Sequence, residues 1–170
     1  MRLLTPINSM NRRSDRGFTL VEVLVALVVL SVGLLGMAKM VMVSSHSNDS
    51  AYLRSQAVSL GYQALDSMRA NLPASTTTGY ATTLAATPAA PTSCYAASCL
   101  SGAMATWDVY AWKQALATSL PQGKGSITTS GGFPMIATVV VQWDDSVAQT
   151  VFKAAAPANP VSITLQTVLQ

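Results

Sequence analysis

The sequence predicts an α+β fold in which one long N-terminal helix packs on a small antiparallel sheet. Three observations support this class. A mostly apolar run occupies residues 18–38, an apolar stripe at helical spacing continues to residue 72, and short segments of alternating polarity fill the C-terminal part of the chain. A long helical pattern followed by a group of strands is typical of an α+β domain.

The charges of the chain are few and unevenly placed. Only 10% of the 170 residues are charged, and the formal net charge is +3. The whole excess lies before residue 18, in Arg2, Arg12, Arg13 and Arg16 against Asp15. From residue 18 onward, basic and acidic residues balance. Basic residues before an apolar segment keep that end in the cytoplasm, so we interpret the excess as a topology signal and expect no nucleic-acid partner.

The apolar segment at 18–38, FTLVEVLVALVVLSVGLLGMA, is long enough for one bilayer crossing, which takes about 20 residues. A cleaved secretory signal is one explanation, with Gly36-Met37-Ala38 as its cut site, but the run exceeds the usual apolar core of about 7–15 residues. A plain membrane anchor is another explanation. Neither accounts for Glu22, because a carboxylate at this depth costs about 2.5–3.5 kcal/mol on insertion scales.

A third explanation comes from residues 16–22, RGFTLVE, which resemble the processing site of type IV prepilins and pseudopilins. The resemblance implies that a membrane peptidase cuts between Gly17 and Phe18 and then methylates the new amino group of Phe18. Residues 1–17 would be a leader that is removed. Met10 remains an alternative to Met1 as the start of that leader.

Glu22 is the assembly residue that this resemblance implies. It would attract the Phe18 ammonium of a neighbouring subunit while the filament forms. One helical turn separates the two positions, so the charges can meet on one helix or between adjacent helices. Each charge then lowers the cost of burying the other in hydrocarbon.

Beyond the membrane segment, the helix is predicted to continue to about residue 72. Residues 18–43 would form its transmembrane and filament-core half, and residues 44–72 its amphipathic half. An apolar stripe recurs there at steps of three or four, at Leu53, Ala57, Leu60, Ala64, Met68 and Leu72. Such a stripe packs against a core, so residues 73–170 are expected to form a periplasmic globular head on it.

The first part of the head, residues 73–103, is rich in Ala, Thr, Ser and Pro and predicts a loop region. Cys94 and Cys99 lie within it. Export to an oxidising compartment would favour a disulfide between them. The composition fits a plain linker and an exposed variable loop equally well.

Regular structure is predicted again in the rest of the head. Helical spacing returns over about residues 104–120, with Thr106 as a candidate N-cap. Strands are predicted over about residues 126–169, including one at 148–153, with a turn at Asp144-Asp145-Ser146. Three or four antiparallel strands would then pack on the C-terminal half of the long helix, as in the pilin architecture.

Further stretches are similar to minor pilins of the PilV, or type IV pilus modification, family. They are, in order, residues 18–38, 52–57 (YLRSQA), 68–71 (MRAN), 112–116 (WKQAL), 120–123 (LPQG) and 141–144 (VQWD). The resemblance implies a structural subunit, not an enzyme, that helps to prime type IV pilus assembly. It would lie in a minor-pilin complex at the filament tip and support adhesion and twitching motility.

The resemblance also implies partners and a location. The partners are the prepilin peptidase and methylase, other minor pilins, the major pilin and a tip adhesin. The protein would cross the inner membrane once, with its head in the periplasm, and would later be found at the pilus tip. A minor pseudopilin of a type II secretion system is the alternative, because its precursor carries the same processing signal.

An enzyme is disfavoured. His46 is the only histidine and is expected to be a solvated helix residue, so no Ser/His/Asp set can form without it, and no phosphate-binding loop is evident. Asp144 and Asp145 could share a calcium ion, but few oxygen ligands lie near them in the sequence and a turn is favoured. No cofactor or metal is expected.

Overall fold

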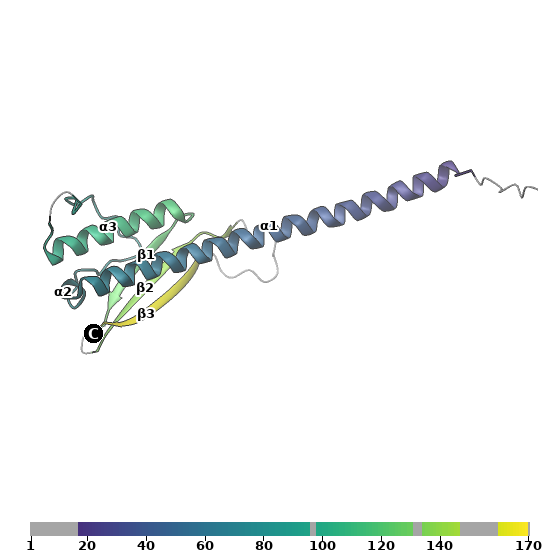
Figure 1. Cartoon of the computed structure of the whole chain (residues 1–170). Helices are drawn as coiled ribbons and strands as arrows, with labels where there is room; N and C mark the ends of the chain where they lie inside the picture. Colours follow the sequence, from purple (N-terminus) through teal and green to yellow (C-terminus); the bar gives the residue numbers. More distant parts are fainter. Residues whose placement is uncertain (1–16, 96–97, 131–133, 147–159, 170) are drawn as a thin grey trace, which may run out of the picture. The chain divides into compact units, whose positions relative to one another are not determined.

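The computed structural model describes residues 17–95, 98–130, 134–146 and 160–169. Its elements, in chain order, are α1 (Leu20–Ala70), α2 (Leu72–Ser75), α3 (Ser101–Ser119), β1 (Lys124–Thr129), β2 (Met135–Trp143) and β3 (Val161–Leu169) (Figure 1). The long N-terminal helix followed by a small antiparallel sheet confirms the predicted α+β, pilin-like architecture.

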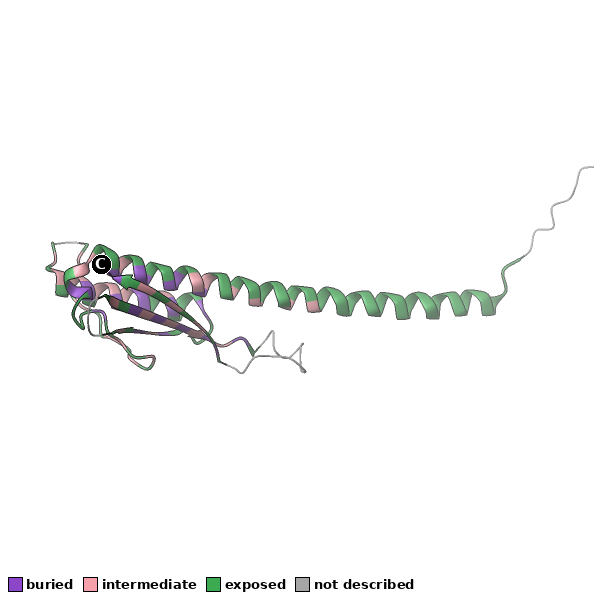
Figure 2. Ribbon diagram, turned by 90° about the horizontal axis from the view of Figure 1, so that it is seen from below, coloured by how far each residue is buried: buried purple, intermediate pink, exposed green. Residues whose placement is uncertain are grey.

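Two units divide the chain, Met1–Val41 and Met42–Gln170, and α1 contributes residues to both. In the first unit, α1 is apolar on all sides. Every large apolar side chain from Phe18 to Val41 is between 47% and 90% exposed, so none of them packs in a core of this chain (Figure 2). A helix that is apolar all round belongs in a membrane or between other subunits.

In the second unit, the three strands form an antiparallel sheet in the order β1-β2-β3. Val139 in the middle of β2 pairs with Ile127 of β1 and with Leu165 of β3. Successive side chains of a strand point to opposite faces of the sheet. The buried face of β2 accordingly carries every second residue, namely Ala137, Val139, Val141 and Trp143.

Helices α1 and α3 cover this buried face of the sheet (Figure 1). The backbone of α1 approaches β2 and β3 at Gly61, where an added Cβ would lie 2.5 Å from Leu165 Cδ1 and 3.8 Å from Val141. Helix α3 approaches β1 at Gly125, whose open side faces the indole of Trp112. The two glycines let a helix and a strand come closer than a side chain would allow.

The predicted apolar stripe of α1 is confirmed. Ala57, Leu60, Ala64 and Met68 are buried, and Leu53 and Leu72 pack against the same core. The prediction missed Gly61 and Leu65, which are also buried.

The structure corrects the predicted boundaries of the loop and of the second helix. The helix predicted over about residues 104–120 begins at Ser101, so Thr106 is not its cap. The Thr106 hydroxyl instead donates to the carbonyl oxygen of Gly102, the turn-back bond that Thr makes inside helices. The loop predicted from residue 73 begins with the short helix α2. The strand predicted at 148–153 lies outside the described residues.

Candidate functional site

The N-terminal end of α1 is shaped by Thr19, which precedes the first helical residue. The backbone N–H of Glu22 donates to the Thr19 carbonyl oxygen at 3.1 Å and to its hydroxyl oxygen at 3.3 Å. A Thr at the N-cap position and a Glu three residues later have the spacing of a capping box. The cap satisfies a backbone donor that a helix start otherwise leaves without a partner, and the helix begins at the next residue, Leu20.

Phe18 and Glu22 lie on the same side of this helix start. Together with Val23, Ala26, Leu27 and Leu30 they line one open hollow of about 240 Å³. Glu22 belongs to the first turn, where the helix dipole favours a negative charge. A cut before Phe18 would create an ammonium group about one turn from this carboxylate. Among the described residues, Glu22 has no ion-pair partner before such a cut.

Gly17 is not required by the fold of the described chain. A Cβ added to it would meet nothing within 4 Å, and its backbone is not in the left-handed region that favours glycine.

The segment that follows could cross a membrane. α1 contains an 18-residue window with a mean hydropathy of 2.6, none of which is buried within the protein. By length and composition, it is the one described helix suited to span a bilayer. Length and composition alone would also fit a signal sequence near the N-terminus. Only Glu22 and its neighbours can distinguish this segment from such a signal.

The two cysteines lie together in the head. Cys94 and Cys99 form a disulfide, with their Cα atoms 5.6 Å apart. Tyr95, within the loop that this bond closes, is 88% exposed. Its ring packs edge-to-face on Trp107 of α3, with ring centres 5.5 Å apart. The disulfide loop therefore presents an aromatic side chain at the surface of the head.

His46 and the two aspartates do not come together as one site. The side chain of His46 is half-buried rather than solvated, and its buried Nδ1 has no hydrogen-bond partner within the described structure. Asp145 is buried and accepts a 2.7 Å hydrogen bond from Ser50 of α1. Asp144 accepts one from Gln122. Over the described ranges, no group of three or more His, Cys, Asp or Glu residues could hold a metal ion.

A polar network joins the C-terminal end of α1 to α3, and sequence analysis missed it. The Tyr80 hydroxyl, buried in the head, donates to Asp108 Oδ2 at 2.6 Å. The Asn71 amide donates to the Tyr80 hydroxyl and to the Ser101 carbonyl oxygen, and the Ser101 hydroxyl donates back to Asn71. Burial and the neighbouring Asp108 raise the pKa of Tyr80 well above its usual 10.0. The residues of this polar network are scattered through a loop and two helices, so no local sequence pattern predicts them.

The comparisons with known proteins single out the N-terminal segment. Residues 12–38 match the family described as the Prokaryotic N-terminal methylation motif. The match includes Gly17, Phe18 and Glu22 and ends before the head. No curated protein and no solved structure matches the chain.

The architecture defines an α+β protein of pilin-like fold, and the motif narrows the class. It is a prepilin-type motif and indicates a type IV pilin- or pseudopilin-like protein. Proteins with this motif are structural subunits rather than enzymes. The motif implies processing by a prepilin peptidase and association with other pilins. Motif and apolar helix together are consistent with membrane anchoring and incorporation into a pilus.

Proposed function

We propose that this chain is a minor pilin of the PilV type, which primes assembly of a type IV pilus and remains in a minor-pilin complex at the tip. The placement of Phe18 and Glu22 carries the proposal, because both line one hollow at the start of an exposed apolar helix. The order of the short stretches in the helix, in α3 and in β2 supports the narrower assignment to minor pilins.

The first step of the proposed mechanism is processing at the membrane. The peptidase cuts between Gly17 and Phe18, and a Cβ at Gly17 would meet no other described residue within 4 Å, so the fold leaves this position open to an enzyme. The product has a methylated ammonium at Phe18, directly before the Thr19 cap. A positive charge at a helix N-terminus is unfavourable by itself, since the helix dipole is positive there. The Glu22 carboxylate, one turn away, offsets this cost.

The second step is lateral association of the apolar helices. A charged side chain at the centre of a membrane helix costs about 2.5–3.5 kcal/mol on insertion scales, and Glu22, near the start of the segment, would cost a part of this without a partner. A neighbouring subunit offers its Phe18 ammonium, and the pair is better tolerated in hydrocarbon than either charge alone. Only the stagger that brings these two groups together satisfies both, so the ion pair would set the register between subunits.

The N-terminus of the membrane-bound protein tests this proposal. We expect mass spectrometry of sheared pili and inner membranes to find a chain that starts at N-methylated Phe18. The Glu22→Ala variant should still be cut, but it should be lost from the filament fraction. Asp66→Ala, which removes an exposed carboxylate from the C-terminal part of α1, is the matched control and should enter filaments. A chain starting at Lys39, or an uncut chain, would overturn the assembly mechanism.

A minor pseudopilin is the second candidate, because the methylation motif fits both classes. Deletion of the gene distinguishes them. Loss of pili and twitching with normal protein secretion supports the minor pilin. Normal piliation with failed secretion of periplasmic substrates supports the pseudopilin.

A further inference from the structure

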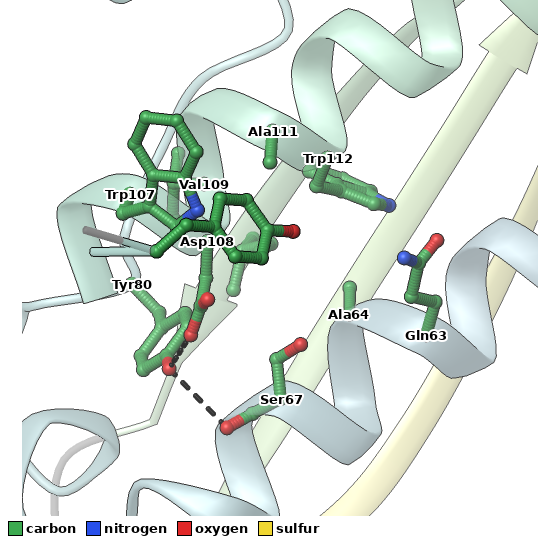
Figure 3. A pocket seen from close by; sticks show the side chains of 11 residues that line it. Gln63, Ala64, Ser67, Tyr80, Trp107, Asp108, Val109, Ala111 and Trp112 are labelled. Carbon is green, nitrogen blue, oxygen red and sulfur yellow. Dashed lines mark hydrogen bonds between the residues drawn. The ribbon is translucent and has the colours of Figure 1, made fainter. Parts of the chain in front are cut away.

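A pocket of about 110 Å³ lies between α1 and α3 in the second unit (Figure 3). Gln63, Ala64 and Ser67 line it from α1, and Trp107, Asp108 and Trp112 from α3. Sites for drug-sized ligands usually measure about 300–1,000 Å³. This pocket therefore suits a single functional group or side chain rather than a whole small molecule.

Aromatic rings form much of the rim. Tyr95 and Trp107 stand at 89° to each other, so they present ring surfaces in two directions. Trp107 in turn contacts Tyr110, with ring centres 5.8 Å apart. The faces of such rings carry negative electrostatic potential and attract organic cations. Tyr95 is 88% exposed, which leaves its ring accessible to a partner from outside.

Asp108 adds a carboxylate to the aromatic rim. Its Oδ2 accepts the 2.6 Å hydrogen bond from Tyr80, whose hydroxyl also lies 3.2 Å from the Ser67 carbonyl oxygen (Figure 3). This contact holds the Asp108 carboxylate in place. Because a carboxylate has about four acceptor positions in all, the bond from Tyr80 leaves others for a ligand. No lysine or arginine is among the described residues that line the pocket.

Two basic side chains on the helices that line the pocket, Arg69 of α1 and Lys113 of α3, bind other groups. The Arg69 guanidinium bonds Asp66 and Thr167, and the Lys113 ammonium bonds the carbonyl oxygens of Thr83 and Gly125. Among the described residues, the pocket therefore combines aromatic faces with one carboxylate and no basic side chain.

We propose that this pocket receives the arginine side chain of another protein. A guanidinium is planar, stacks on aromatic faces, and can donate two parallel hydrogen bonds to a carboxylate, which an ammonium cannot do. Free arginine fits less well, because its own carboxylate would find no positive group among the lining residues. All residues that line the pocket belong to the second unit, Met42–Gln170, so this inference does not depend on processing at Gly17 or on Glu22.

The test uses the full-length chain in detergent micelles and arginine blocked at both ends, N-acetyl-arginine methylamide. The chain has three tryptophans, so the three indole N–H signals of an NMR spectrum can report separately. We expect saturable shifts of the Trp107 signal on titration. Trp143, buried in the sheet, serves as the internal reference and should not move. Blocked citrulline, the neutral analogue, should leave the Trp107 signal in place at equal ionic strength.

Two variants test whether the Asp108 carboxylate itself binds the guanidinium or whether any loss of negative charge weakens binding. Asp108→Asn keeps an acceptor for Tyr80 and should weaken binding of blocked arginine at least about tenfold. Asp49→Asn removes an exposed carboxylate of α1 away from the pocket lining and should bind as the parent does. An unchanged reference signal of Trp143 shows that each variant is folded.

Three outcomes would overturn the proposal. One is equal binding of blocked arginine and citrulline. Another is equal or tighter binding of blocked lysine, of tetramethylammonium or of free arginine, because the site would then not select a protein-borne guanidinium. The third is a Trp107 signal that moves with simple sugars and not with arginine.

Discussion

The indole N–H of Trp112 donates a 2.9 Å hydrogen bond to the backbone carbonyl oxygen of Leu60. This bond links α3 to α1 in the interior of the head, where Trp112 is 4% exposed. Trp112 also packs on the open side of Gly125 in β1. One side chain therefore joins the two helices and the first strand.

Replacement of Trp112 by phenylalanine should destabilise the head by about 2–4 kcal/mol, because it removes a buried hydrogen bond and leaves a cavity. Urea unfolding of the chain in detergent, followed by circular dichroism, measures this change. Trp107→Phe is the matched control, since Trp107 lies at the rim of the pocket, and it should cost less than half as much. Equal losses in the two variants would contradict the role assigned to Trp112.

Lys113 is a buried cation held by backbone oxygens. Its ammonium donates 2.6 Å hydrogen bonds to the carbonyl oxygens of Thr83 and Gly125, and it thereby fastens the loop and β1 to α3. Lys113→Met removes the ammonium from the buried Gly125 oxygen, and loss of a donor to a buried acceptor costs about 1–3 kcal/mol. The Thr83 oxygen still accepts a hydrogen bond from the Ala86 N–H, so it adds less. We therefore expect a clear loss of stability at pH 7. Lys124→Met, at an exposed position of β1, is the control and should change the free energy of unfolding little.

The pH dependence of Lys113 has a definite sign. Burial lowers the pKa of Lys113 below its usual 10.5. The unfolded chain then holds this proton more tightly than the folded chain, so stability rises as the pH approaches 10.5 from below. The rise should be absent in Lys113→Met when the free energy of unfolding is measured from pH 8 to 10. A parallel slope in the variant would assign the effect to other groups.

Tyr80 shows the opposite dependence. Burial and Asp108 raise the pKa of Tyr80 in the folded head above its value in the unfolded chain. The contribution of Tyr80 to the free energy of unfolding is therefore fully present below about pH 10 and falls as the pH rises further. The parent protein should lose stability between pH 10 and 11 relative to Tyr80→Phe, which cannot ionise. Tyr62→Phe, at an exposed position of α1, should follow the parent. Equal slopes in Tyr80→Phe and the parent would refute this assignment.

Two glycines should respond differently to substitution by alanine. At Gly125 an added Cβ would clash with the rigid indole of Trp112 and lie 2.6 Å from Leu116 Cδ1. Overpacking of this kind costs about 1–3 kcal/mol. At Gly61 the obstacle is the flexible end of Leu165, and alanine gains up to about 1 kcal/mol of helix propensity. Thermal unfolding should therefore show a clear loss for Gly125→Ala and a small change for Gly61→Ala.

The sequence was sufficient to predict the fold class because its patterns are local. The stripe from Leu53 to Leu72 has helical spacing, and the strand from Met135 to Trp143 alternates, so each element can be assigned from its own residues. The processing motif is equally local, since Gly17, Phe18 and Glu22 lie within six consecutive positions. Such patterns are readable without knowledge of the tertiary contacts.

The start of α3 and the polar network could not be predicted in this way. Ser101 is helical although it lies before the apolar spacing begins, and its hydroxyl is held by Asn71 at the end of α1. Likewise, Lys113 looks like an exposed helix residue until Thr83 and Gly125 are placed around it. These positions depend on contacts between segments far apart in the chain, which outweigh local propensity.

The close approach of Gly61 to Leu165 has a consequence for biosynthesis. Gly61 lies in the first helix and Leu165 in the last strand, so α3 and β2 must be synthesised before the two can meet. At about 5–20 residues per second, the apolar stripe of α1 waits for several seconds without its cover. During this interval the apolar stripe of the head-facing half of α1 is exposed to water, and a chaperone that binds apolar segments would protect it from aggregation.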